Sequence, residues 1–246
     1  MRVLAFQHAA SEDPGSFYQF LQEDGHEWTV IALDRGERIP SLEDYDMLWV
    51  MGGPMDVWDV EEYPWLIPEK DAIRRWVREL ERPFLGVCLG HQLLADALGG
   101  TCGPQRPPEV GIYDIELTPE GRADPILGAL PARQPALHWH SVRVAQPPRD
   151  AVVLARSAHC SNQAMRVGRS AYSMQYHVEL APDTVQKWRS APGYAEYIEN
   201  IHGPGALTKL SIDVEPLVEG ITKNARGLYR GLVGLAGNDS GAQRPS

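Results

Sequence analysis

The chain has 246 residues, a hydrophobic content of 43% and a formal net charge of −10. This composition is typical of a folded globular protein with a sizeable core, and the acidic balance argues against nucleic acid or an anionic membrane surface as a partner. The three cysteines, at positions 88, 102 and 160, are too few and too scattered for a disulfide framework. The pattern shows neither a secretory leader nor an apolar stretch long enough to span a bilayer, so we expect a cytoplasmic protein.

The first half of the chain alternates predicted strands and helices. Strands are expected at residues 3–7, 27–33, 46–51 and 84–87, and helices at 14–23, 69–80 and 89–98. Such alternation predicts a parallel sheet with helices on both faces and with functional groups at the carboxyl ends of the strands. We therefore expect an α/β protein with a flavodoxin-like, mostly parallel central sheet.

The second half has a different pattern. Strands are expected at residues 111–117, 137–144, 151–155 and 171–176, and they are joined by proline-rich loops that include a possible cover for the site at 102–108. We interpret them as an antiparallel extension of the same sheet. Helices return at 184–190, 194–201 and about 205–235, the last with a break near 214–216. The prediction is a single domain, 1–236, followed by a disordered tail, 237–246.

One stretch organises the rest of the chain around a cysteine. Cys88 lies between the predicted strand 84–87 and the helix that follows it, with Gly86 and Gly90 two residues to either side. This is the thiol version of a nucleophile elbow, a sharp turn that projects the nucleophile above the edge of the sheet. The helix N-terminus at this position favours negative charge. The alternative is a buried, inert cysteine in an ordinary turn, and the glycine spacing favours the reactive interpretation.

A nucleophilic cysteine needs a base, and a third group has to orient that base. Among eight histidines, His177 is the best candidate because it follows the predicted strand 171–176 and therefore lies at a carboxyl end. Glu179 is two residues further on, and in extended chain such residues point the same way. Its carboxylate can then orient the imidazole and stabilise the imidazolium. A His-x-Glu seen alone would be interpreted as a solvated loop, but the upstream elbow favours catalysis.

Three blocks of the chain resemble the motifs of class I (triad) glutamine amidotransferases. The blocks are Gly52-Gly53-Pro54, the stretch from Gly86 to Gln92, and the stretch from Gln175 to Glu179, and the likeness runs from about residue 3 to 188. Within that family the chain is most similar to free-standing, GMP-synthase-like members. The resemblance implies that Cys88 attacks a γ-glutamyl amide to form a thioester, with His177 and Glu179 as acid–base pair.

The resemblance also implies further site residues and no cofactor or metal. Backbone N–H groups of Gly53 and Leu89 would form the oxyanion hole, and Gln92, His140 and Ser141 would contact the substrate. Glycine at position 53 also makes physical sense, because the backbone there has to approach the substrate closely. The implied first substrate is glutamine, which would be converted to glutamate and ammonia.

The chain departs from the family pattern in two respects, and these leave alternatives open. Val178 replaces a proline that would rigidify the turn between His177 and Glu179, and the chain has no room for a synthetase domain that would accept ammonia. A γ-glutamyl peptide or amine is therefore the alternative substrate. A synthase partner is also possible, and the protein would then be inactive alone. A non-catalytic binder is disfavoured by the intact Cys, His and Glu, and an α/β-hydrolase by the order of its acid and histidine.

His138 and His140 have the spacing of metal ligands on a strand. The sequence shows no third ligand at a suitable spacing, so we interpret both as structural residues and predict no metal site.

Overall fold

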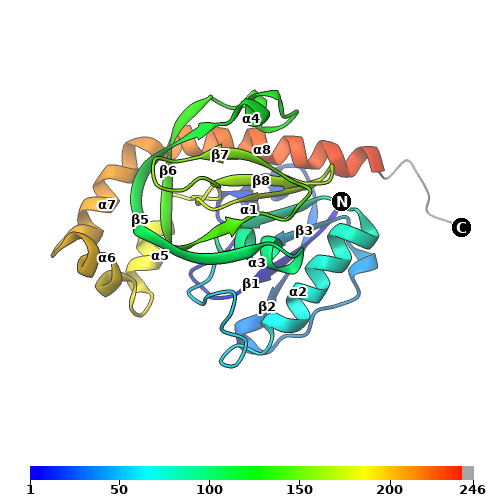
Figure 1. Cartoon of the computed structure of the whole chain (residues 1–246), viewed down its shortest axis with the longest axis horizontal. Helices are drawn as coiled ribbons and strands as arrows, with labels where there is room; N and C mark the ends of the chain where they lie inside the picture. The colour runs from blue at the N-terminus through cyan, green and yellow to red at the C-terminus, as the bar shows by residue number, and fades with distance from the viewer. Residues whose placement is uncertain (240–246) are drawn as a thin grey trace, which may run out of the picture.

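The apolar run near the start of the chain forms β1 (Arg2–Gln7), which lies between β2 (Glu27–Ala32) and β3 (Met47–Val50) and pairs with both in parallel. β4 (Phe84–Val87) and β9 (Ala171–Met174) continue the parallel series. Figure 1 shows the computed structural model, which describes residues 1–239. The order β2-β1-β3-β4-β9 is the flavodoxin-like arrangement that the sequence predicts.

Antiparallel strands extend this sheet beyond β9. In spatial order they are β8 (Ala164–Val167), β7 (Ala151–Arg156), β5 (Thr101–Leu117) and β6 (Arg133–Gln146). Each pairs antiparallel with its neighbour, so the described residues form one mixed sheet of nine strands. The predicted antiparallel extension of a single sheet is confirmed.

Helices cover both faces of the sheet. The first face carries α1 (Ser16–Glu23) and α8 (Val218–Asp239), whose apolar side chains share a core with those of β1 and β3. The opposite face carries α2 (Leu66–Arg75) and α3 (Leu89–Ala97), which pack on β3 and β4 through a second core.

The remaining helices lie near the antiparallel end of the sheet. A third apolar cluster joins β5 and β6 to α5 (Thr184–Ser190), α6 (Tyr194–His202) and α7 (Ala206–Val214), which form the yellow-to-orange group in Figure 1. The short helix α4 (Pro119–Ala123) lies between β5 and β6 in sequence and contacts β7.

The structure corrects several predicted bounds. The loop predicted at residues 102–108 belongs to the long strand β5, and β8 is a strand that the sequence pattern does not indicate. Helix α2 begins at Leu66 and continues as a π-helical turn, Trp76–Leu80. The expected break near 214–216 separates α7 from α8. Helix α8 includes the first three positions of the predicted tail 237–246, and residues 240–246 lie outside the described part of the chain.

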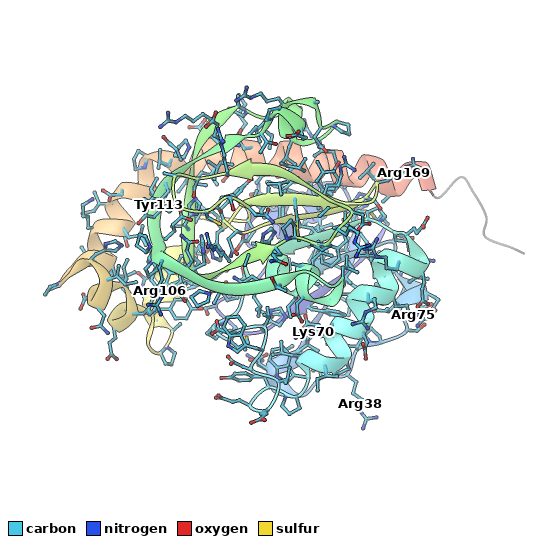
Figure 2. The ribbon with its side chains drawn as sticks, in the orientation of Figure 1. Arg38, Lys70, Arg75, Arg106, Tyr113 and Arg169 are labelled. Atoms are coloured by element: carbon cyan, nitrogen blue, oxygen red, sulfur yellow. The ribbon has the colours of Figure 1, made fainter. Side chains whose placement is uncertain are left out.

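Charged side chains cover the periphery of the fold. Figure 2 shows Arg38, Arg75 and Arg169 at its edge, where all three are exposed, and Arg75 pairs with Glu43. Such pairs are solvated and contribute little to stability. Across residues 1–239, no helix has the length and the apolar character needed to cross a membrane.

Candidate active site

The predicted nucleophile sits on a strained turn. Cys88 connects β4 directly to α3 and has φ 52° and ψ −104°, a conformation that costs a residue other than glycine about 1–3 kcal/mol. A Cβ atom at Gly86 would lie 2.5 Å from the Gly90 carbonyl oxygen, and one at Gly90 would lie 2.0 Å from the carbonyl oxygen of Val50. The glycines on either side are therefore required by backbone contacts, and the elbow predicted from the sequence is present.

The predicted base is held against the antiparallel part of the sheet. The His177 backbone N–H donates to the Leu137 carbonyl on β6 at 2.8 Å, which is an isolated antiparallel bridge beyond the end of β9. Its ring packs edge-on against Trp188 of α5, with 4.8 Å between the ring centroids. These contacts fix both the backbone and the plane of the imidazole.

Glu179 is positioned to orient this imidazole. Its Oε1 lies 2.7 Å from Nδ1 of His177, and both side chains are buried. Burial lowers the pKa of His177, but its interactions with Glu179 and Cys88 outweigh that effect and raise it well above 6.5. The geometry predicted for the His-Glu pair is present although Val178 replaces the expected proline.

The backbone of Glu179 is anchored to the first helix. Its carbonyl oxygen accepts from the Ser16 N–H at 2.8 Å, at the N-terminus of α1. A Cβ atom at Gly15 would lie 2.1 Å from that same oxygen, so only glycine lets the chain pass. The segment after β9 is thus tied both to β6 and to α1.

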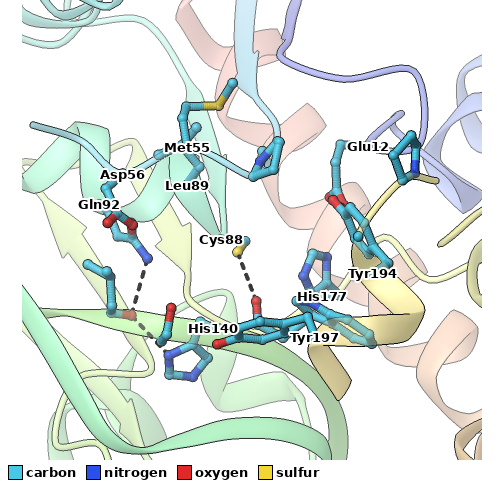
Figure 3. Close-up of a pocket in the computed structure, with 17 residues that line it drawn as sticks. Glu12, Met55, Asp56, Cys88, Leu89, Gln92, His140, His177, Tyr194 and Tyr197 are labelled. Atoms are coloured by element: carbon cyan, nitrogen blue, oxygen red, sulfur yellow. Dashed lines mark hydrogen bonds between the residues drawn. The ribbon is translucent and has the colours of Figure 1, made fainter. Parts of the chain in front are cut away.

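Cys88 and His177 line one cavity at the carboxyl edge of the parallel strands, shown in Figure 3. Its volume is about 270 Å³, which suits a ligand of amino-acid size. Five of the six other predicted site residues also line it, namely Gly53, Leu89, Gln92, His140 and Ser141, and Glu179 is not among the lining residues. The fold therefore brings to one cavity residues that come from separate stretches of the chain.

The peptide between Gly52 and Gly53 is held by a buried pair that sequence reasoning missed. Nδ1 of His8 donates to the Gly52 carbonyl at 2.8 Å, and its Nε2 donates to Glu69 Oε1 at 2.8 Å. Burial lowers the pKa of His8, but Glu69, with help from the Gly52 carbonyl and Glu12, outweighs this and raises it. In a trans peptide the C=O and N–H groups point in opposite directions. Anchoring the Gly52 carbonyl therefore directs the Gly53 N–H away from His8.

Two of the predicted substrate-contact residues, Gln92 and His140, already form hydrogen bonds with other residues of the chain. Gln92 Nε2 donates to the Val142 carbonyl and to Gln175 Oε1, each at 3.2 Å. Nδ1 of His140 lies 3.0 Å from the same Val142 carbonyl (Figure 3). Its Nε2 faces Glu109 at 3.0 Å. Both residues line the cavity while they tie neighbouring elements together.

Glu12 is an acidic residue that lines the cavity and that sequence reasoning also missed. Its Oε1 accepts from the Tyr194 hydroxyl at 2.7 Å, so α6 is linked to the loop after β1. Burial raises its pKa, as does the charge of Glu179, against the opposing effects of His177 and Tyr194. Only their position in the sequence could have identified His8 and Glu12 as site residues. Both follow the carboxyl end of β1, at the edge of the sheet where functional groups were expected.

Comparison with known proteins agrees with this arrangement. Residues 16–187 match the family model for class-I glutamine amidotransferases. The glutamine amidotransferase-like protein YfeJ of Salmonella typhimurium is 30% identical over 190 residues, which cover 76% of this chain and 79% of that protein. A subunit of the glutamine-hydrolyzing GMP synthase of Sulfolobus acidocaldarius is 30% identical over 152 residues, or 61% of this chain and 76% of that one.

A solved structure has the same fold over almost the whole chain. A glutamine amidotransferase from Thermotoga maritima superposes with a TM-score of 0.85 at 27% sequence identity, covering 95% of this chain and 98% of that one. With a family model that matches most of the chain, a relative similar over most of both lengths and this shared fold, the protein belongs to the class-I glutamine amidotransferase family.

Proposed function

We propose that this protein hydrolyses or transfers a γ-glutamyl amide through a covalent thioester on Cys88, with glutamine as the first substrate. One observation carries the proposal: a cysteine on a strained elbow shares a small cavity with His177, whose imidazole is hydrogen-bonded to the buried Glu179. Family membership supports the same chemistry. A buried imidazole with a raised pKa beside a thiol is the arrangement that activates a cysteine nucleophile.

The proposed reaction has two halves. Cys88 Sγ attacks the side-chain amide carbon, and the resulting oxyanion is held by the N–H groups of Gly53 and Leu89. His177 takes the thiol proton of Cys88 during the attack and passes it to the departing nitrogen, so the C–N bond breaks, ammonia leaves and a γ-glutamyl thioester remains. Water then attacks the thioester and loses a proton to His177. Collapse of that second oxyanion releases glutamate and restores Cys88.

The charges around the cavity suit the amino group of such a substrate. Glu12 and Asp56 both line it, and among the lining residues within 1–239 there is neither lysine nor arginine. A carboxyl group there can pair with the α-ammonium group of glutamine, while the α-carboxylate has to be bound by uncharged donors such as backbone N–H groups. Glu12 and Asp56 are therefore the proposed determinants for a free amino group.

The test is a substrate panel with purified protein alone. Glutamine and γ-glutamyl peptides or amines are compared by the release of glutamate, ammonia or free amine, with Cys88→Ala as the control. Turnover of glutamine supports glutaminase activity. Turnover of conjugates but not of glutamine supports the γ-glutamyl hydrolase or transferase alternative. Absence of every turnover, with Cys88 also inert to γ-glutamyl electrophiles, would refute the proposal.

A partner-dependent form of the same chemistry is the second candidate. The relative from Sulfolobus acidocaldarius is named as one subunit of a GMP synthase, which marks it as part of an assembly. In this form a synthase partner would accept the ammonia, and the chain alone would be inactive. A co-purifying chain that raises glutamine turnover many-fold would support it, whereas full turnover by the isolated chain would contradict it.

A further inference from the structure

A buried cluster at the border of the cavity joins the two histidines that the sequence left without a third partner. His138 and His140 alternate along β6 and so face the same side of the sheet. The register of β5 against β6 places Glu109 opposite His140, and it places Gly111, which has no side chain to fill the space, opposite His138. The third residue of the cluster thus comes from the neighbouring strand.

The spacing of the three side chains fits a metal ion. Glu109 Oε2 lies 3.0 Å from His140 Nε2 and 3.7 Å from His138 Nδ1, and all three candidate ligand atoms lie within 4.8 Å of one another. A tetrahedral site with metal–ligand bonds of about 2.0–2.1 Å separates its ligands by about 3.3 Å. The observed distances lie on either side of that value, so a cation could be bound with small side-chain shifts.

The hydrogen bonds of the cluster are incomplete without a cation. Because His140 Nδ1 faces the Val142 carbonyl at 3.0 Å, it has to carry the hydrogen there, and in the neutral ring Nε2 then presents a lone pair to the Glu109 carboxylate. Neither ring nitrogen of His138 has a hydrogen-bond partner in the described part of the chain, although the ring is fully buried. A proton on His140 would resolve only the first conflict, whereas a divalent cation would bind the His140 lone pair and also one of the two unpartnered nitrogens of His138.

Neighbouring side chains hold Glu109 and His138 in place, as the residues that surround the ligands of metal sites do. The Ser157 hydroxyl donates to Glu109 Oε1 at 2.5 Å, and Gln163 Nε2 donates to Glu109 Oε2 at 2.6 Å. Tyr113, labelled on β5 in Figure 2, packs edge-on against His138 with 5.5 Å between the ring centroids. Hydrogen bonds of this kind fix the orientation of ligating carboxylates and imidazoles.

We propose that Glu109, His138 and His140 bind a divalent transition-metal cation, with zinc as the best match to two imidazoles and one carboxylate. Its role would be to hold the strands in place, and its fourth coordination position would be filled by a ligand other than these three residues, such as water. Trp139, between the two histidines, places its carbonyl 3.7 Å from Cys88 Sγ, and His140 lines the cavity. A cation there would fix the stretch of β6 that borders the proposed reaction centre without contacting the reacting atoms.

The test measures metal binding directly and does not depend on turnover. The full chain, stripped with a chelator, is titrated with Zn²⁺ by calorimetry and with Co²⁺ by absorption spectroscopy. We expect about one equivalent of either metal at micromolar affinity or tighter, with a Co²⁺ spectrum that lacks thiolate charge transfer and persists in Cys88→Ser. Glu109→Gln and His138→Gln should each weaken binding at least about tenfold, since loss of even an outer-shell partner costs about 10–100-fold. His26→Ala, a histidine distant in sequence, is the matched control.

Two outcomes would overturn the proposal. One is that the wild-type chain takes up neither metal, which would leave the cluster as a buried ion pair. The other is that folded Glu109→Gln and His138→Gln bind as tightly as wild type, which would place the metal elsewhere. If these variants do not fold, anomalous diffraction from zinc-soaked wild-type crystals decides the matter: a peak about 2.1 Å from the three ligand atoms supports the site, and a peak elsewhere or none refutes it.

Discussion

Replacing Glu179 by glutamine should lower the pKa of His177 without unfolding the site. The carboxylate lies 2.7 Å from Nδ1 in a buried setting. A hydrogen bond to a charged group contributes about 1.5–3 kcal/mol, and about 1.36 kcal/mol corresponds to one pKa unit, so we expect a decrease of about 1–2 units. The glutamine Oε1 can still accept from Nδ1–H and keep the tautomer. The expected loss in kcat/KM is therefore about 10–100-fold, short of the roughly 10⁴-fold that a wrong tautomer causes in serine proteases.

The assay is an NMR titration of the imidazole resonances, in which His177→Gln identifies the signal of His177. The raised pKa means that the stability contributed by this proton is complete below the ordinary value of 6.5 and is lost as pH rises through the folded-state value. In Glu179→Gln that loss should begin at lower pH. Glu116→Gln, at a partly exposed acid on β5 that pairs with arginines, is the control. A His177 pKa that is the same in wild type and in Glu179→Gln would refute the reasoning.

Three further predictions concern the elbow at Cys88 and the Gly52–Gly53 peptide, whose N–H is a proposed oxyanion-hole donor. Cys88→Gly should be more stable than Cys88→Ala by about 1–3 kcal/mol in urea unfolding, because glycine relieves the positive φ of 52°; equal stabilities would show that the turn is unstrained. Gly90→Ala should lower the free energy of unfolding by about 1–3 kcal/mol or more, because the added Cβ would lie 2.0 Å from a backbone carbonyl oxygen. Its control is Gly234→Ala in α8, where no atom lies within 4 Å of the added Cβ and the substitution should be neutral or stabilising. His8→Asn should lower kcat by up to about 100-fold with little change in KM, because one oxyanion-hole donor contributes about 10²–10³ in kcat; a change in KM alone would contradict a positioning role.

Sequence reasoning succeeded where local constraints determine the structure. The bounds of β4 match the prediction. Gly86 and Gly90 are required by close backbone contacts, which Gly86 makes with Gly90 and Gly90 makes with Val50 on the adjacent strand. The His177–Glu179 pair is also local, since its members are two residues apart. Such features follow from turn chemistry and from the alternation of an extended chain.

It failed where prolines interrupt an otherwise regular strand. Pro104, Pro107 and Pro108 suggested a loop, yet they belong to β5, because the register shifts between Pro104 and Glu109 and the prolines are not required to donate to a regular ladder. The strand β8 has four residues and no clear alternation, which is too short a signal for detection from one sequence.

Contacts between residues that lie far apart in the chain could not be predicted from the sequence either. His8 and Glu69 are 61 positions apart, and Glu109 meets His138 and His140 only through the register of β5 and β6. No local pattern marks these side chains as partners, since each is an ordinary polar residue in its own segment. Only the sheet topology shows which buried charges share a site.

The central claim is that the sulfur of Cys88 forms a covalent bond with a γ-glutamyl carbonyl carbon. The most direct measurement is mass spectrometry of the intact chain and of its peptides after incubation with a γ-glutamyl electrophile, with free glutamine as competitor. The account predicts one adduct, on Cys88, that glutamine suppresses and that is slower to form in His177→Gln. Labelling spread over Cys102 and Cys160, or labelling of Cys88 that neither glutamine nor a γ-glutamyl conjugate suppresses, would contradict it.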